Sequence, residues 1–239
     1  MLTGAGCSLT YGSELEGVGT SFHTDPEQSF KKTFIAKIAN KLNTDYTVVA
    51  TPGASNKSIA RSVLPYLYKK DVTKIIVCWT WMERINISDV CVSPMPYESY
   101  MAGTYTGPVT SAMWEIYGNY QLGFENQLES LEAYYLVNST AIANSKTVYN
   151  VNMGSFLDAI LPYNNKTLPN DHWTNSGSDN LCNHPYWHIV NKCNNLFDNE
   201  PLHYKIPKEA KTEIGHFTEH GHIVCADLIL SEMNNANYI

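Results

Sequence analysis

The sequence Gly4-Ala5-Gly6-Cys7-Ser8-Leu9-Thr10-Tyr11-Gly12 joins a short apolar start to a glycine-rich turn. Small residues on both sides of Ser8 allow the backbone to turn sharply, so its hydroxyl can be held exposed at the end of a strand. A nucleophilic serine requires such a position, together with a base and an orienting carboxylate from elsewhere in the chain. The pattern is also typical of an ordinary glycine-rich turn, so the remaining sequence must supply the partners.

The chain after this turn alternates between strand and helix patterns. Apolar and β-branched runs predict strands over residues 2–6, 46–50, 74–80 and 147–151. Apolar residues at helical spacing predict helices over residues 26–43, 57–69, 117–138 and 219–233. Strands that alternate with helices are typical of a three-layer α/β/α sandwich with a mainly parallel sheet, and we predict this α/β fold class.

Length and composition favour one folded domain. The 239 residues fit a single large domain, and 44% hydrophobic with 16% charged residues is typical of a folded protein rather than a disordered one. We therefore predict one domain over residues 1–239. Residues 162–205 are polar, aromatic and rich in asparagine without a clear period. They are expected to form an irregular insertion, which is either a functional lid or binding segment or a missed element.

Charge and hydropathy exclude two classes of partner. The 16 basic and 23 acidic residues give a net charge of −7 without a basic stripe, so nucleic acid is not expected as a partner. No apolar run reaches transmembrane length and the start lacks a signal-peptide pattern, so neither membrane insertion nor secretion through a cleaved signal is expected. The six cysteines form no Cys-x-x-Cys pair, and reduced, buried thiols are expected, although Cys182 and Cys193 could form a disulfide.

Three positions that suit a binding site directly follow predicted strands. Ser8, Gly53 and Thr80 come after the first, second and third strand, respectively. In an open parallel sheet, sites form beyond the carboxyl ends of the strands. We therefore expect these three residues to lie at one edge of the sheet.

A second candidate cluster precedes the last predicted helix. It reads Glu213-Ile214-Gly215-His216-Phe217-Thr218-Glu219-His220-Gly221-His222. The spacing of Glu213 and His216 lets one short turn carry a base and the carboxylate that orients it. The stretch also matches His-x-x-Glu-His, in which His216 and His220 would bind zinc on a helix and Glu219 would act as the base. The two glycines make a continuous helix doubtful here, and a polar loop with surface histidines is a third interpretation.

Three short blocks carry a family resemblance. Gly6-Cys7-Ser8-Leu9-Thr10-Tyr11-Gly12 resembles a Gly-Asp-Ser-Leu-Thr-x-Gly block, with Cys7 in place of the aspartate. Glu213-Ile214-Gly215-His216 resembles an Asp-x-x-His block, and Pro52-Gly53-Ala54-Ser55-Asn56 is placed like a glycine block after the second strand. In this order the blocks resemble those of the SGNH hydrolases, also called the GDSL esterase/lipase family.

The resemblance implies a flavodoxin-like fold and a role for each block. Ser8 would be the nucleophile, His216 the general base and Glu213 the orienting acid. The backbone N–H groups of Ser8 and Gly53 would form part of an oxyanion hole, which stabilises the charge of the tetrahedral intermediate.

The chain departs from the family at the third block. A Gly-x-Asn-Asp sequence is expected near residues 78–84, where this chain reads Cys78-Trp79-Thr80-Trp81-Met82-Glu83-Arg84, so the oxyanion asparagine is absent. Asn56 and Thr80 are best placed to replace it. Asn56 is preferred for its amide N–H, although it could equally cap the following helix. Arg84 could orient substrate or pair with Glu83. Phage-encoded family members with a Trp-Thr segment, a following arginine and a Gly-Ala-Ser-Asn stretch look similar to this chain.

The prediction that follows is a serine hydrolase that cleaves an ester through an acyl-enzyme on Ser8. Resemblance and the sixteen tyrosines and five tryptophans lead us to expect a short acyl group such as acetyl, carried by a small molecule or a carbohydrate. This mechanism requires no metal or organic cofactor. The alternatives are a zinc hydrolase built on the His-x-x-Glu-His stretch and a catalytically inactive binding or structural module. A phage-encoded protein would act in the host cytoplasm or the virion, and the sequence does not indicate an oligomeric state.

Overall fold

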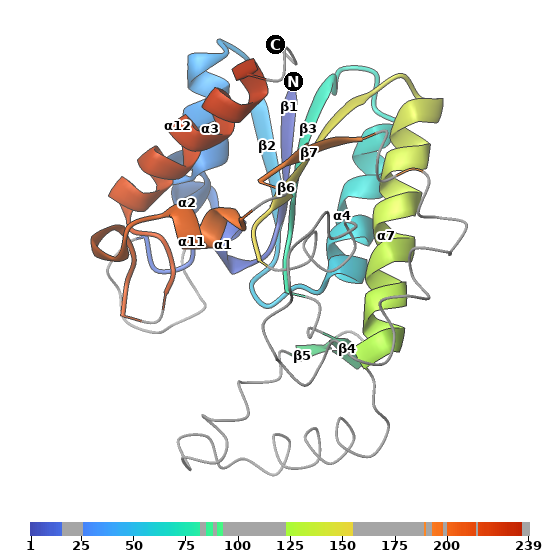
Figure 1. The fold of residues 1–239 in the computed structure, drawn as a ribbon. Helices are drawn as coiled ribbons and strands as arrows, with labels where there is room; N and C mark the ends of the chain where they lie inside the picture. The colour runs from blue at the N-terminus through green and yellow to red at the C-terminus, as the bar shows by residue number, and fades with distance from the viewer. Residues whose placement is uncertain are drawn as a thin grey trace.

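The protein contains one five-stranded parallel sheet. A computed structural model describes residues 1–15, 26–81, 85–87, 90–92, 123–154, 189, 193–197, 200–213 and 215–235 (Figure 1). The strands of the sheet are β1 (Leu2–Gly6), β2 (Tyr46–Ala50), β3 (Lys74–Trp79), β6 (Thr147–Asn152) and β7 (Asn194–Leu196). Their order is β2-β1-β3-β6-β7, and all neighbours are parallel. A separate antiparallel pair joins β4 (Ile85–Ile87) to β5 (Val90–Val92).

Helices cover both faces of the sheet. On one face α3 (Phe34–Lys41) packs against α12 (Glu219–Asn235), and on the other face α4 (Asn56–Leu67) packs against α7 (Gly123–Ala143) (Figure 1). The shorter helices are α1 (Ser8–Tyr11), α2 (Pro26–Lys32), α11 (Leu202–Lys205) and the 3₁₀ helix η1 (Lys208–Ala210). The predicted three-layer α/β/α sandwich is therefore confirmed. Within the part of the chain that the structure describes, no helix combines the length and the apolar character needed to span a bilayer.

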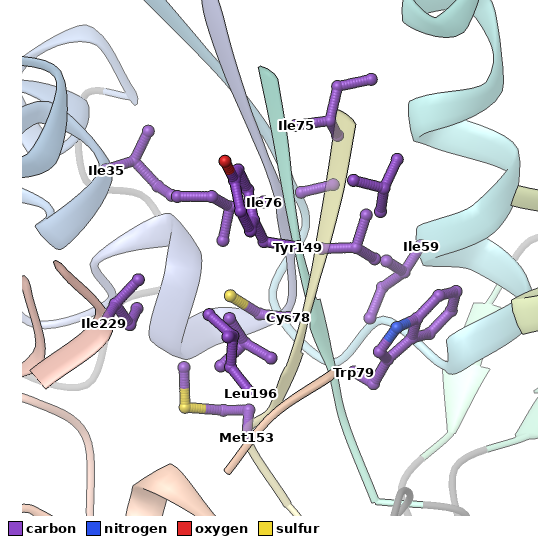
Figure 2. Close-up of a cluster of buried hydrophobic side chains, with 14 of the residues drawn as sticks. Ile35, Ile59, Ile75, Ile76, Cys78, Trp79, Tyr149, Met153, Leu196 and Ile229 are labelled. Carbon is purple, nitrogen blue, oxygen red and sulfur yellow. The ribbon is translucent and has the colours of Figure 1, made fainter. Parts of the chain in front are cut away.

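The side chains of β3 alternate between the two layers of helices. Trp79 points toward Ile59 of α4, and Cys78 points to the opposite face, where Ile229 of α12 lies (Figure 2). All of these side chains are buried. The near-continuous apolar run of this strand thus reflects a sheet that is covered on both faces.

Several elements differ from the sequence-based prediction, such as α7, which ends at Ala143 rather than at residue 138, and the unpredicted α1, β4, β5 and η1; two further differences concern residues 26–43 and 162–205. The single helix expected over residues 26–43 is divided into α2 and α3, because Thr33 adopts an extended backbone and its hydroxyl accepts a hydrogen bond from Ala36 N–H at 3.5 Å. A threonine in this conformation starts a new helix rather than continuing one. In addition, β7 and α11 lie inside residues 162–205, where no regular element was predicted. Most of the remaining residues of that segment lie outside the described part.

The strand order positions the candidate site. From β1 the chain passes first to β2 at one side and then, through α4, to β3 at the other side of β1. The direction of winding therefore reverses at β1. In open α/β sheets, ligands bind beyond the carboxyl ends of the strands at such a reversal. Ser8 follows β1 directly and lies at this point.

Candidate active site

Ser8 is the first residue of a one-turn helix, α1, that begins two residues after the end of β1, an inner strand of the sheet. Cys7 links β1 to α1 in an extended conformation, and Gly12 ends α1 at a φ of 80° in the left-handed region, where glycine is favoured. A side chain at Gly6 would meet Thr10 Oγ1 at 2.1 Å, so the glycine allows α1 to fold back against the end of β1. Only 6% of Ser8 is exposed. The glycine-rich turn therefore holds the hydroxyl in a position that is largely shielded from water.

The three strand-end residues meet at one edge of the sheet, as predicted. β1 pairs in parallel with β2 on one side and with β3 on the other. Ser8, Gly53 and Thr80 each lie just beyond the carboxyl end of one of these strands. Gly53 adopts a φ of 76° in the turn after β2.

A carboxylate contacts the candidate base, but it is not the one that the sequence predicted. His216 Nδ1 lies 3.3 Å from Glu14 Oε2, six residues after Ser8 in the sequence. Thr212 Oγ1 donates a hydrogen bond to the same Glu14 oxygen at 2.8 Å and accepts one from His216 N–H at 3.2 Å. The side chains of His216 and Glu14 are 18% and 21% exposed, respectively. Glu14, Thr212 and His216 thus form one hydrogen-bonded unit beside the nucleophile turn.

The backbone of Glu14 is itself unusual. Its φ is 69°, in the left-handed region that non-glycine residues rarely adopt. Such conformations persist where the surroundings enforce them, and they concentrate at functional sites. The hydrogen bond from Thr212 and the contact with His216 are interactions that hold the side chain in place.

Glu213 lies on the exposed side of the turn that carries His216. Its side chain is exposed, whereas Glu14 is mostly buried against Nδ1. Gly215, between Glu213 and His216, has a φ of 86°, which redirects the chain between them. Three-residue spacing therefore does not bring this acid to the base, and the assignment of Glu213 as the orienting acid lacks a contact within the described part of the chain.

The zinc interpretation required His216 and His220 on one helix, and the structure contradicts that requirement. α12 begins at Glu219, so His216 lies in the preceding loop. His220 is exposed, and Glu219 is 56% exposed with Lys37 at 3.9 Å. Among the described residues, no group of three or more His, Cys, Asp or Glu side chains is arranged to hold a metal ion.

His222 has a structural partner. Its ring is fully buried, and Nδ1 accepts a hydrogen bond from the N–H of Phe34 at 3.1 Å. Burial lowers the pKa of His222 to about 3, with smaller contributions from the charges of Lys37 and His216. The neutral imidazole therefore joins α12 to the first residue of α3.

Asn56 pairs with the backbone of Thr80. Its Oδ1 accepts the Thr80 N–H at 2.8 Å, and its Nδ2 donates to the Thr80 carbonyl at 3.3 Å and to Ser130 Oγ at 3.2 Å. The two amide hydrogens are thus directed at groups of the protein. The cap of α4 is the preceding residue, Ser55, whose hydroxyl accepts from Ser58 N–H at 3.2 Å. Asn56 is therefore neither a helix cap nor a donor that points into open space.

Sequence reasoning did not identify His203, which lies next to the candidate base. Its ring stacks on Phe217 and meets the edge of Trp81 at centroid distances of 5.9 and 5.5 Å. Burial lowers its pKa to about 4, and the charges of Lys211 and His216 lower it further. Residues 162–205, which include His203, are rich in aromatic side chains, but no motif or periodic pattern in the sequence distinguishes position 203.

Two predicted features lie outside the described residues, and one pair of groups does not touch. Arg84 and the aromatic segment 172–188 are outside that part of the chain, as is Cys182, while Cys193 carries a free thiol.

No hydrogen bond joins the side chains of Ser8 and His216, both of which are described. Hydrogen bonds between catalytic groups are often long without substrate and shorten in the reacting complex.

Comparisons with known proteins show the fold. No protein-family model and no curated protein sequence matches the chain. The psychrotrophic esterase EstA from Pseudoalteromonas sp., in a structure inhibited by monoethylphosphonate, matches with a TM-score of 0.54 over 100% of this chain and 98% of its own, at 6% identity. A family two carbohydrate esterase from Clostridium thermocellum, in complex with cellohexaose, matches with a TM-score of 0.50 over 98% of this chain and 63% of its own, at 15% identity. The chain therefore shares the α/β fold of these two esterases, which agrees with the fold class that the sequence predicted.

Proposed function

We propose that the protein is a serine hydrolase that cleaves esters, with Ser8 as the nucleophile, His216 as the general base and Glu14 as the carboxylate that orients the base. One observation carries this proposal: Glu14 Oε2 lies 3.3 Å from His216 Nδ1, on the segment that directly follows the nucleophile turn. A histidine with a carboxylate at one ring nitrogen, beside a serine at a strand end, is the arrangement that activates a hydroxyl.

The proposed roles follow from the chemistry of the imidazole. If Nδ1–H donates to Glu14, Nε2 carries the lone pair that accepts the proton of Ser8. The Ser8 oxygen then attacks the ester carbonyl, and His216 passes the proton to the departing alcohol. Water releases the acyl group in a second cycle of the same steps. Glu14 stabilises the imidazolium in both transition states, and the backbone N–H groups of Ser8 and Gly53 are the proposed donors to the oxyanion.

For the substrate we propose a short acyl ester, such as an acetyl ester, on a small molecule or a carbohydrate. Two observations support this choice. The Clostridium thermocellum neighbour is a carbohydrate esterase in complex with cellohexaose. The ring of Trp81 meets that of His203 near the loop that carries His216, both side chains are only partly buried, and such rings combine apolar faces with polar groups, as sugar ligands require. The phage origin and the role of Arg84 stay predictions from the sequence.

The test is hydrolysis of a panel of p-nitrophenyl esters and acetylated oligosaccharides by the wild type, by Ser8→Ala and by the wild type with a chelator. We expect hydrolysis of the acetyl esters that Ser8→Ala abolishes and that the chelator leaves unchanged. Loss with the chelator alone would support the zinc enzyme instead. Absence of hydrolysis of every ester, with binding of an oligosaccharide retained, would refute the enzyme and support a binding module.

A further inference from the structure

We infer that the hydroxyl of Thr80 replaces the missing asparagine as the side-chain donor to the oxyanion, and that Asn56 holds Thr80 in place. This inference rests on the proposed serine hydrolase. The sequence favoured Asn56 as the donor, since its amide offers the same chemistry. The contacts of the two residues lead to the opposite assignment.

The first step is the occupation of the Asn56 amide. Its nitrogen donates to the Thr80 carbonyl and to Ser130 Oγ, and its oxygen accepts the Thr80 N–H. β1 pairs with β3 only as far as Val77, and the chain then enters α1. The backbone of Thr80 therefore does not have β1 as a hydrogen-bonding neighbour. The amide of Asn56 takes the place of a peptide group of that strand. It fixes the backbone of Thr80 and has no hydrogen left for a substrate.

The second step is the position of Thr80 relative to Ser8. The pairing of β1 with β3 reaches Ala5 and Val77. β1 ends at Gly6, two residues before Ser8, and β3 ends at Trp79, one residue before Thr80. Since neighbouring strands are about 4.8 Å apart, Ser8 and Thr80 follow adjacent strands at the same edge of the sheet.

The third step is the face of the sheet on which the Thr80 side chain lies. A Cβ added at Gly6 would lie 2.1 Å from Thr10 Oγ1 of α1 and 3.1 Å from the Cβ of Cys78. Cys78 therefore lies on the face of the sheet that α1 covers. Alternate residues of an extended strand point to the same face. Thr80, two residues after Cys78, is therefore directed to the face that carries Ser8.

The fourth step is the state of the hydroxyl. Thr80 is fully buried, and its Oγ1 has no hydrogen-bond partner among the described residues. A buried hydroxyl without a partner lowers the stability of the folded protein, and a catalytic role is one reason why such a group is kept. A hydroxyl can rotate its hydrogen toward a new acceptor without moving the backbone.

Thr80 keeps its hydroxyl proton throughout the proposed reaction. When Ser8 Oγ bonds to the carbonyl carbon, the π electrons of the carbonyl move to its oxygen. Thr80 Oγ–H donates a hydrogen bond to that oxygen and keeps its proton. When the carbonyl re-forms, the alcohol leaves with the proton from His216. Because the charge on the oxygen exists only in the transition state and the intermediate, the hydroxyl acts on kcat rather than on binding of the substrate.

The test compares Thr80→Val, Thr80→Ala and Thr80→Ser with the wild type on the p-nitrophenyl ester that the wild type hydrolyses best. Removing one oxyanion donor lowers turnover by about 10²–10³, so we expect such losses in kcat for the valine and alanine variants with little change in KM. Thr80→Ser keeps the hydroxyl and is expected to retain kcat within about tenfold. Urea unfolding is expected to show Thr80→Val to be at least as stable as the wild type, since the change removes an unpaired buried hydroxyl.

Thr3→Val is the matched control. Thr3 Oγ1 is also buried without a partner among the described residues, but it lies within β1, away from the carboxyl end of the sheet. We expect the control to keep the wild-type kcat. Wild-type turnover in folded Thr80→Val and Thr80→Ala, while Ser8→Ala abolishes hydrolysis, would overturn the role of Thr80 and leave the serine hydrolase intact. Hydrolysis that does not depend on Ser8 would refute the proposed function, and the inference with it.

Discussion

Replacement of Glu14 by glutamine is the sharpest test of how the base is oriented. The substitution keeps the size of the side chain and an oxygen that can accept from Thr212, but it removes the charge that faces His216 Nδ1 at 3.3 Å. At this distance, unit charges attract by about 5 kcal/mol at an effective dielectric constant of about 20. The two side chains are 18% and 21% exposed, so solvent screening reduces this to about 2–3 kcal/mol, or roughly 10²-fold in kcat.

The assay is steady-state hydrolysis of the best p-nitrophenyl ester, with kcat and KM determined separately. We expect kcat to fall and KM to change little, because the imidazolium that Glu14 stabilises forms only in the transition state. Glu14→Gly adds a second readout. Glycine adopts a φ of 69° without strain, and this relief of about 1–2 kcal/mol offsets the loss of the hydrogen bond from Thr212, so the variant is expected to change the free energy of unfolding by less than about 1 kcal/mol while it loses activity. A purely structural glutamate would not separate stability from turnover in this way.

Glu213→Gln is the control for Glu14→Gln. Glu213 is exposed, so its replacement is expected to leave kcat unchanged. The opposite pattern, with kcat lost in Glu213→Gln and retained in Glu14→Gln, would refute the reasoning and restore the acid that the family resemblance implies.

Two further predictions concern stability. His203 and His222 have folded-state pKa values of about 4 and about 3, below the ordinary value of 6.5. The unfolded chain therefore binds more protons between pH 4 and 6.5, so stability is fully present above pH 6.5 and falls by about 1.4 kcal/mol per pH unit for each histidine as pH decreases. Urea unfolding from pH 4 to 7 should show this slope, His222→Asn should reduce it by about half, and a flat profile would contradict the prediction. Gly6→Ala should destabilise by at least about 2 kcal/mol, because the new Cβ would lie 2.1 Å from Thr10 Oγ1. Gly53→Ala meets no atom within 4 Å and should cost only the left-handed strain of about 1–2 kcal/mol; equal thermal unfolding midpoints for the two variants would contradict the steric argument.

The sheet edge could be predicted from the sequence because it follows from local patterns. Ser8, Gly53 and Thr80 each lie at the end of a run that predicts a strand or within three residues of it, and parallel strands place their carboxyl ends together. No knowledge of side-chain contacts was needed.

The contact between Glu14 and His216 could not be predicted in the same way. Glu14 and His216 are 202 residues apart in the sequence, whereas Glu213 is only three residues from the histidine. Spacing therefore favoured Glu213, but the side chain of Glu213 is exposed, and Gly215 between the two residues has a left-handed backbone. The direction of a side chain depends on backbone angles that residue spacing does not contain.

The same limit applies to Asn56 and to the segment 162–205. An asparagine at the start of a helix suits either a cap or a donor. Its pairing with the backbone of Thr80 joins residues 24 positions apart in the sequence, and no local pattern predicts such a contact. β7 has only three residues, which is too short to show a period, so its addition to the edge of the sheet depends on its packing against β6.

The contact between Glu14 and His216 has a consequence for the synthesis of the protein. Ser8 and Glu14 leave the ribosome on one short segment, and His216 follows Glu14 only after about two hundred further residues. A second long-range bond, from Phe34 N–H to His222, likewise waits for the C-terminal helix. Pairings of such sequence separation form late in folding. If the proposed roles hold, Ser8 is inactive in a nascent chain, and ester hydrolysis begins only after the C-terminal residues that carry His216 and His222 have packed against the sheet.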